Sequence, residues 1–445
     1  MEIPAIPLFW IMPFVLLLLS IAIIPLVSTH FWGKYYPIFS VILGLIVVVL
    51  YLTLLNTQDT HFYGSYKLFH TFIEYVGFIA LVGSLFVVVS GIYLDIIAKP
   101  TPFINASILS IGCILANVMG TVGASMLLIR PYLRINNQRI KPYHLVFFIF
   151  LVSNMGGALL PIGDPPLFLG YLKGIPFFWL IDRIFFVWLL GLGIVLIIFI
   201  AFEFFTNKKA SNNVENMNEY GPKEIKIEVL GKRNFIWLLC IILLVLSQNQ
   251  LTSLGISSEM VTFFTSVLMI TCSIFAYRGA NKKALRQNEF IFNPIKEVAI
   301  LFGGIFATMM PALDYLELNA HKLGLEHPGQ FFFASGILSA FLDNAPTYLN
   351  FLSAAFGLCG MNVDNDLHME KFLNTPELAL YIEAISMGCV FFGALSYIGN
   401  APNFMVKSIA DQLEVKTPTF LGYMLKYSIP ILIPPFFIVW LIFFS

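Results

Sequence analysis

The sequence predicts an all-α polytopic membrane protein, built as an inverted repeat of two five-span halves, each with one re-entrant hairpin and one broken transmembrane helix. Three observations predict this fold: the composition, an internal repeat, and the distribution of basic residues among the loops. The 445-residue chain is 58% hydrophobic and only 11% charged, whereas a soluble domain carries roughly 25% charged residues. So few charges cannot cover the water-facing surface of a soluble protein of this length.

Composition and charge also bear on the possible partners. The formal net charge is +0, which gives no reason to expect a nucleic-acid partner. The cysteines show neither metal spacing nor a disulfide framework, and no cofactor is expected. The first apolar run has no basic region before it and exceeds a signal-peptide core, so it is interpreted as a membrane span. The expected location is the cell (cytoplasmic) membrane, where the multi-pass chain would be surrounded by the lipid bilayer.

The second observation is a polar segment that occurs twice. The stretch Gly157–Pro166 returns as Gly393–Pro402, at a constant spacing of 236 residues, which is just over half the chain. Each copy places glycine and proline inside apolar sequence. Two matching interruptions in the two halves of a membrane protein are the best sequence indication of a transporter's binding site.

Apolar runs define the individual spans. A span needs about 20 mainly apolar residues to cross roughly 30 Å of hydrocarbon. Unbroken spans are predicted near residues 8–28, 37–55, 70–94, 180–206, 234–250, 259–277, 297–315 and 419–444. The longer stretches 142–178 and 376–413 each contain one copy of the repeat, and each is predicted to cross once as a broken helix.

The distribution of basic loops, which mark the cytoplasmic side, decides how the stretches 102–129 and 331–357 are threaded. Basic residues crowd 130–141, 207–233 and 278–296, whereas the loops 316–330 and 358–375 lean acidic. This pattern fits if 102–129 enters from the cytoplasm and turns back, and if 331–357 enters from outside and turns back. Five crossings per half is an odd number, so the second half is predicted to be inserted upside down. The predicted domains are a first repeat over 1–206, a cytoplasmic linker over 207–233 and a second repeat over 234–445.

Four polar clusters would meet at the same depth if the hairpins reach the middle of the bilayer. Irregular backbone is tolerated there only where it is buried in protein or lines a wet cavity, and freed carbonyls or half-helix ends can hold an ion. The candidate ion- or substrate-binding residues are Asn117, Thr121, Ser153, Asn154, Asp164, Asp343, Asn344, Thr347, Ser396, Asn400 and Asn403.

Asp164 and Asp343 are the two candidate ligands of a metal ion, with sodium as the expected ion. An ionised carboxylate near the middle of the membrane costs about 2.5–3.5 kcal/mol, and neither residue has Lys or Arg nearby in the sequence. Burial therefore favours the protonated carboxyl group, while a bound cation favours the ionised one. A carboxylate that holds either a proton or a cation, but not both, is the minimum machinery for exchange.

Structural interpretations of the same residues remain open. The glycine and proline breaks could be helix kinks, the asparagines could be interhelical hydrogen-bond partners, and Asp343 could lie at a mouth of the site. Glu383, within an apolar run, is a weaker candidate for a proton path. An intramembrane aspartyl protease would also need two carboxylates, but it would have no use for a duplicated break, and no enzyme activity is expected.

The segment Ser153–Gly157 running into Pro161–Pro165, together with Leu342–Pro346, resembles the ion transporter superfamily. Within it, the chain is most similar to the NhaD-type sodium/proton antiporters and to the related citrate-transporter-like and arsenite-permease proteins. The resemblance implies an inverted-repeat fold with two re-entrant hairpins and two broken helices, and a homodimer with a scaffold and a moving transport part. It also implies that Asp164, Asp343–Asn344, Ser153–Asn154 and Asn117 line the ion site.

Two departures from the family patterns bear on the transported species. Antiporters of the NhaD type tend to have Asp-Asn at the first hairpin tip, whereas Ala116 precedes Asn117 here. The dicarboxylate branch typically has Ser-Asn-Thr at both tips, and neither tip here matches. The leading hypothesis is a sodium/proton antiporter with small ions as substrates. The alternatives are a sodium- or proton-coupled organic-anion symporter of the citrate or dicarboxylate type, and an arsenite-type oxyanion extruder.

Overall fold

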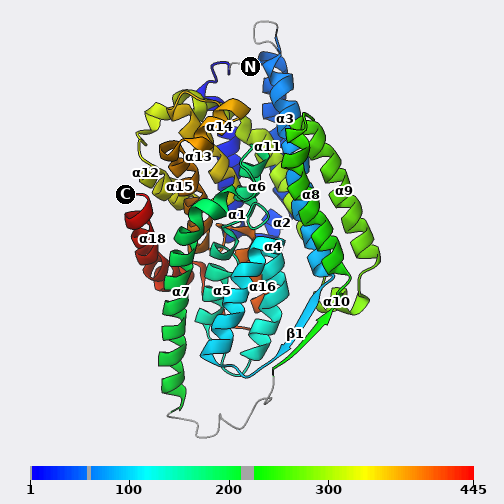
Figure 1. The fold of residues 1–445 in the computed structure, drawn as a ribbon, viewed down its shortest axis with the longest axis vertical. Coiled ribbons are helices and arrows are strands. Elements are labelled where there is room, and N and C mark those ends of the chain that lie inside the picture. Colours follow the sequence, from blue (N-terminus) through cyan, green and yellow to red (C-terminus); the bar gives the residue numbers. More distant parts are fainter. Residues whose placement is uncertain (1–2, 58–61, 212–224) are drawn as a thin grey trace.

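The computed structural model describes residues 3–57, 62–211 and 225–445, and within them the chain is almost entirely helical (Figure 1). The first half contains η1 (Leu8–Ile11), α1 (Met12–Val27), α2 (Thr29–Leu54), α3 (Tyr63–Ser90), β1 (Tyr93–Ile97), α4 (Pro102–Ile135), α5 (Pro142–Leu151), η2 (Met155–Gly157), α6 (Pro165–Leu172) and α7 (Trp179–Ser211). The second half contains β2 (Lys226–Leu230), α8 (Asn234–Ser253), α9 (Ser258–Arg278), α10 (Lys282–Gln287), α11 (Asn293–Asn319), η3 (Ala320–Leu323), α12 (Pro328–Ser339), α13 (Asn344–Leu358), α14 (Asp366–Asn374), α15 (Pro376–Phe392), η4 (Gly393–Leu395), α16 (Ala401–Gln412), α17 (Phe420–Tyr423), the π-helical η5 (Met424–Ser428) and α18 (Ile429–Phe443).

Within the described residues, ten helical segments are long and apolar enough to cross a membrane. Eight of them coincide with the eight unbroken spans that the sequence predicts, and the other two are α4 and α15. The prediction of an all-α polytopic membrane protein is therefore confirmed. The inverted relation between the halves stays a prediction. Many helices have proline in their first turn, which is favourable because its missing N–H has no intrahelical partner there. Proline is the first residue of α4, α5, α6, α12 and α15, and the second residue of α16.

Helix α4 reverses direction at its middle. Gly120 has φ 78° and ψ 155°, a conformation that glycine adopts readily and that breaks the helix. The residues at the two ends of α4, Asn105 and Asn136, exchange side-chain hydrogen bonds of 2.9 and 2.8 Å. A Cβ atom added at Gly112 would meet the Leu128 side chain at 3.1 Å. The two arms therefore lie side by side, with Gly120 at the tip, and α4 enters and leaves at the same end of the molecule.

Helices α12 and α13 form a comparable pair in the second half. They are joined by residues 340–343, and the rings of Phe331 on α12 and Phe351 on α13 pack with centroids 6.2 Å apart. The segments α5–α6 and α15–α16 are each interrupted by a short 3-10 turn and extended residues, at 152–164 and 393–400. The helix breaks therefore lie where the two copies of the repeated segment occur.

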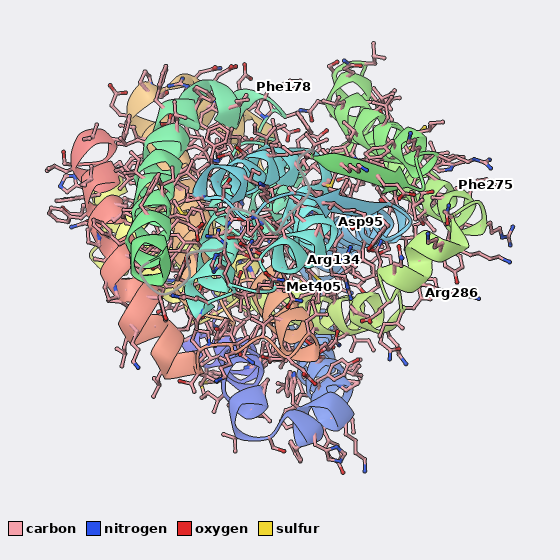
Figure 2. The ribbon with its side chains drawn as sticks, turned by 90° about the horizontal axis from the view of Figure 1, so that it is seen from below. Asp95, Arg134, Phe178, Phe275, Arg286 and Met405 are labelled. Carbon is pink, nitrogen blue, oxygen red and sulfur yellow. The ribbon has the colours of Figure 1, made fainter. Side chains whose placement is uncertain are left out.

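A small antiparallel sheet, which the sequence analysis did not predict, joins the two halves. Strands β1 and β2 pair from Tyr93 with Leu230 to Ile97 with Lys226. The predicted linker 207–233 is partly occupied by the end of α7 and by β2, and residues 212–224 lie outside the described part of the chain. Figure 2, which views this end of the molecule, shows Asp95 of β1 beside Arg134 of α4. Arg134 pairs with the Asp95 carboxylate and donates to the Tyr93 hydroxyl at 2.7 Å.

The helices form two groups in Figure 1. Helices α8 and α9 stand on one side with α3, and α7, α12, α15 and α18 stand on the other. Helix α14 lies at the end opposite β1. Because the sequence predicts that the loop 358–375 lies outside the cytoplasm, this end is called the outer end below. The apolar core is continuous across both groups, with α5 buried from Tyr143 to Leu151.

Candidate ion-binding site

Asp164 is the convergence point of the interrupted helices. Its side chain is 1% exposed. One carboxylate oxygen accepts hydrogen bonds from the Thr121 hydroxyl at 2.8 Å and the Asn400 amide at 2.9 Å. The other oxygen accepts from the Asn344 amide at 2.5 Å. Thr121 follows the tip of α4, Asn344 begins α13, and Asn400 precedes α16, so all four interruptions meet at one carboxylate.

Local backbone geometry explains how Asp164 is placed. It is the N-cap residue of α6, and the next two positions are prolines, which cannot donate backbone hydrogen bonds. The Thr121 N–H donates to the Gly163 carbonyl at 2.8 Å, which docks the tip of α4 on the break. A side chain on Gly163 would overlap the Gly157 carbonyl oxygen. The tight turn before Asp164 therefore requires glycine.

The residue just before the half-helix has the same backbone conformation in both copies of the repeat. Asp164 has φ −144° and ψ 144°, and Asn400, 236 residues later, has φ −150° and ψ 142° and also begins a half-helix. These two equivalent residues are hydrogen-bonded to each other. Equivalent positions touch each other in this way only near the axis that relates two copies. The contact is compatible with the predicted pseudo-twofold arrangement, which stays a prediction.

Asp343 lies next to this centre without a direct hydrogen bond to Asp164. It is half-buried, and its carboxylate accepts from the Ala345 N–H at 3.0 Å, which caps α13. Its neighbour Asn344 is the residue that contacts Asp164. Thr347 donates to the Asp343 carbonyl at 3.0 Å within its own helix. Of these residues, Asn344 alone contacts the buried carboxylate directly.

Asn117 and Ser396 contact backbone groups at the breaks. The Asn117 amide donates to the Gly156 carbonyl at 2.6 Å, and its oxygen accepts from the backbone N–H of Leu159 at 2.9 Å. Ser396 donates to the Ala340 carbonyl at 2.5 Å and accepts from the Gly399 N–H at 3.0 Å. Each residue therefore joins a hairpin tip to the break beside it, and neither donates to Asp164.

The two breaks are also joined directly. The Asn154 amide donates to the Asn403 side-chain oxygen at 2.6 Å, and Asn403 in turn donates to the Gly393 carbonyl at 2.9 Å. Ser153 pairs with Ser125 at 2.8 Å, and the Ser153 carbonyl lies 3.3 Å from the Asn400 amide nitrogen. Sequence reasoning missed Ser125, although its position one helical turn after Thr121 places it on the same face of α4.

Three amide oxygens around Asp164 have no hydrogen-bond donor among the described residues, namely those of Asn154, Asn344 and Asn400. All three side chains are at most 1% exposed. A Cβ atom at Gly393 would lie 3.2 Å from the Asn154 oxygen and 3.8 Å from the Asn344 amide nitrogen, so these side chains are close together. Buried polar atoms normally have partners. Oxygen atoms are also the ligands that hard cations prefer, so this donor set fits a small cation.

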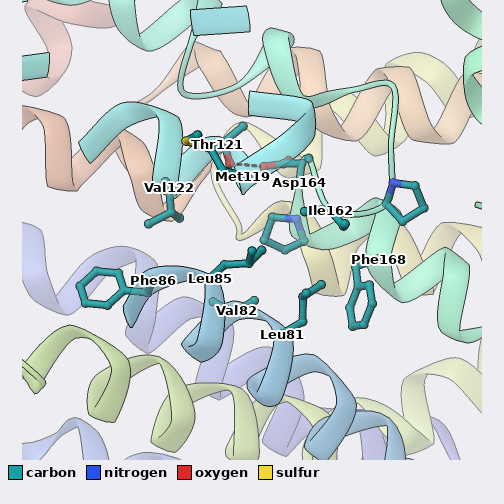
Figure 3. Close-up of a pocket in the computed structure, with 15 residues that line it drawn as sticks. Leu81, Val82, Leu85, Phe86, Met119, Thr121, Val122, Ile162, Asp164 and Phe168 are labelled. Carbon is teal, nitrogen blue, oxygen red and sulfur yellow. Dashed lines mark hydrogen bonds between the residues drawn. The ribbon is translucent and has the colours of Figure 1, made fainter. Parts of the chain in front are cut away.

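A cavity of about 30 Å³ adjoins Asp164. Figure 3 shows the Thr121–Asp164 hydrogen bond at its edge and the side chains of Leu81 and Leu85 facing it from α3. Space of this size exceeds the roughly 10–15 Å³ that one water molecule needs. The walls are mainly apolar, so the carboxylate is the principal polar group at this cavity.

Charged residues outside this centre form separate contacts. Glu383 lies 3.8 Å from Arg183 and does not reach Asp164 by any described hydrogen bond. Within the described residues, no ion pair includes Asp164 or Asp343. The site is thus a carboxylate surrounded by neutral amides and a hydroxyl.

Comparison with known proteins agrees with the resemblance to citrate-transporter-like proteins. No curated protein matches the chain. A family model described as "Putative citrate transport" matches residues 3–444. Since that match covers nearly the whole chain, the protein belongs to this family of membrane transporters.

Proposed function

We propose that the protein is a sodium/proton antiporter in which Asp164 binds a sodium ion and a proton in turn. The observation that carries this proposal is the composition of the site. A single buried carboxylate accepts hydrogen bonds only from neutral groups, and three amide oxygens beside it have no donor among the described residues. Among the described residues, no lysine or arginine forms an ion pair with this carboxylate, so no side-chain cation competes there with a bound ion.

The asparagines supply a simple way to exchange the two ligands. Asn344 and Asn400 donate to Asp164 through their nitrogens, while the oxygens of the same amides accept no hydrogen bond from any described residue. Rotation of an amide by 180° replaces an N–H donor with an oxygen ligand, because the two ends of the group have similar size. Sodium would then be bound by the Asp164 carboxylate and the turned amide oxygens. When sodium leaves, one oxygen of Asp164 takes up a proton from the solution, and a turned amide oxygen accepts the hydrogen bond of the new O–H group.

Charge explains why exchange would be coupled. Asp164 with sodium and Asp164 with a proton are both electrically neutral, whereas the empty carboxylate carries one negative charge in a largely apolar surrounding. An uncompensated charge at this depth costs several kcal/mol. Movement of the loaded forms is therefore favoured over movement of the empty form, which is the condition for antiport without leakage. Either neutral form can then pass the apolar wall formed by α3 at the cavity.

A second candidate function is cation-coupled symport of a citrate-type organic anion, which the family description favours. Half-helix N-termini can bind carboxylates, and α6, α13 and α16 begin around the site. However, Asp164, Asp343 and Asn400 already occupy the N-cap positions of these helices. An organic anion would have to bind beside an existing negative charge, which is why we place this function second. No contact in the described residues specifically favours an oxyanion extruder.

The test is transport by purified protein in proteoliposomes that contain a pH-sensitive dye. Sodium or lithium added outside should move protons, and Asp164→Asn should abolish the response. Asp182→Asn is the matched control, because Asp182 is an exposed carboxylate in the first turn of α7. Uptake of labelled citrate or succinate without any cation-driven pH change would overturn the antiporter proposal in favour of the symporter.

A further inference from the structure

An alternating series of charges is buried at the outer end of the molecule. Successive links join Glu74 to Lys173 at 2.7 Å, Lys173 to Asp364 at 2.5 Å, Asp364 to Lys67 at 2.8 Å, and Lys67 to Asp314 at 2.9 Å. These five side chains are 0–11% exposed. The Tyr51 hydroxyl ends the series by donating to Asp314 at 2.7 Å. We call these five charged residues the outer charge chain.

Two members of the outer charge chain lie on segments that start at the ion site. Lys173 is the C-cap of α6, whose N-cap is Asp164. Asp364 follows α13, whose first residue is Asn344. The remaining members lie on α3 and α11, which make no hydrogen bond to Asp164 in the described structure. Two links, Glu74–Lys173 and Lys67–Asp364, therefore connect the site-bearing segments to the surrounding helices.

The same position does not fit a metal ion. The side chains of His70, Glu74 and Asp364 offer ligand atoms within 4.8 Å of one another. The Lys173 ammonium group, however, contacts both Glu74 and Asp364. Lysine therefore supplies the positive charge that a metal would otherwise provide.

We propose that the outer charge chain is the closure of the site toward the outer end. In the closed form, the end of α6 and the segment after α13 are held against α3, and the links Glu74–Lys173 and Lys67–Asp364 separate when the site opens to that side. This inference rests on the transporter assignment and on the proposed location of the site at Asp164, but it does not depend on which ion is carried.

Ion pairs suit a closure that must open and close repeatedly. Removing apolar surface from contact exposes it to water at a cost proportional to its area. Charges that leave a buried pair instead regain hydration, which offsets most of the lost attraction. The closed and opened forms therefore differ little in free energy. Removal of one partner has a different effect, because an alternating series then holds an uncompensated charge and the closed form becomes unfavourable.

The first test measures access to the cavity beside Asp164. Met119 lines that cavity and is 1% exposed, so Met119→Cys in a cysteine-free protein reports opening through labelling by a membrane-impermeant maleimide from the outer side. Lys67→Met and Asp364→Asn should each raise the labelling rate about tenfold, the factor that corresponds to a ~1.4 kcal/mol weaker closure. Asp411→Asn is the control, because Asp411 forms a more exposed ion pair with Lys407. Unchanged labelling in both closure variants would overturn the proposal.

The second test fixes the closure covalently. Glu74→Cys with Lys173→Cys, joined by a short cross-linker that attaches to both thiols through disulfides, should stop transport and suppress Met119→Cys labelling, and reduction of these disulfides should restore both. The control is Lys173→Cys with Asp364→Cys, since both residues lie on site-bearing segments, and the cross-linker should leave the transport rate of this variant as it was before the cross-linker was added. Full transport by the first linked pair would refute the closure. Because labelling needs no transported substrate, an error in the proposed ion would leave this readout intact.

Discussion

Replacement of Asp164 by asparagine should separate function from folding. The side-chain oxygen that accepts from Thr121 and Asn400 has a counterpart in the amide oxygen of the new residue, so both of those hydrogen bonds survive Asp164→Asn. The new amide nitrogen would face Asn344, whose own oxygen has no donor among the described residues. A half-turn of the Asn344 amide then restores the third contact. The variant keeps its hydrogen-bond count but loses the carboxylate that we propose binds a proton or sodium.

The magnitudes follow from the same three contacts. Hydrogen bonds to a charged group contribute about 1.5–3 kcal/mol each, against about 0.5–1.5 kcal/mol for neutral ones. Asp164→Asn loses the charge assistance but also the desolvation cost of the charge, so we expect a net change within about 2 kcal/mol. Asp164→Ala leaves three buried donors unpaired at about 1–3 kcal/mol each, and we expect at least about 3 kcal/mol of destabilisation.

The assay combines thermal unfolding in detergent with sodium-driven proton movement in proteoliposomes. Asp164→Asn should unfold close to the wild-type temperature and show no exchange, whereas Asp164→Ala should unfold at a clearly lower temperature. Normal exchange by Asp164→Asn would refute the role of the carboxylate. Equal destabilisation by the two substitutions would refute the hydrogen-bond reasoning.

Three further predictions concern the surrounding structure. Gly163→Ala should prevent stable folding, because the new Cβ would overlap the Gly157 carbonyl oxygen, while Gly193→Ala, with open space around it, should be neutral in yield and melting temperature. Asn117→Ala should lower the melting temperature with little change in sodium affinity, because it removes hydrogen bonds to backbone groups on both sides of a break; a selective loss of affinity at normal stability would contradict this. Burial alone would raise the pKa of Asp364, but Lys173 and Lys67 hold it well below its usual range. The stability that comes from this lowered pKa is fully present above the unfolded-state pKa of about 3.9, and it is lost only as the pH falls through the folded-state pKa. Asp364→Asn should therefore lower the melting temperature equally at pH 5, 7 and 9.

Much of the fold could be predicted because the membrane restricts the alternatives. Apolar length alone placed the eight unbroken spans, for example α9 at Ser258–Arg278 against a predicted span of 259–277. The end of α4 was harder to predict, because Ile135 lies in a basic segment whose sequence suggests a loop, although this segment continues the helix. The β1–β2 pairing was missed because two five-residue segments so far apart carry no local signal that they meet.

The candidate site was predictable in position and less so in the role of each residue. Composition indicates that Asp164 is buried, and the repeat indicates that Asn400 matches it, but neither can distinguish an asparagine that contacts the carboxylate from one that holds backbone. Asn344 and Asn117 look alike in sequence, yet one donates to Asp164 and the other to a carbonyl group. The outer charge chain was not predicted, because most of its members lie near the ends of predicted spans, where solvated charges are common.

The meeting of Asp164 with Asn400 has a consequence for how a duplicated protein can specialise. The two residues occupy equivalent positions in the two copies of the repeat, and the Asn400 amide nitrogen lies 2.9 Å from a carboxylate oxygen of Asp164. Two carboxylates so close would repel each other and share a proton. Here a carboxylate faces an amide, so under the proposed function one copy of the repeat would bind the ion and the other would supply an amide that turns toward it or away from it. Under the proposed function, the duplicated scaffold would therefore present one carboxylate at this contact and bind one monovalent ion at a time.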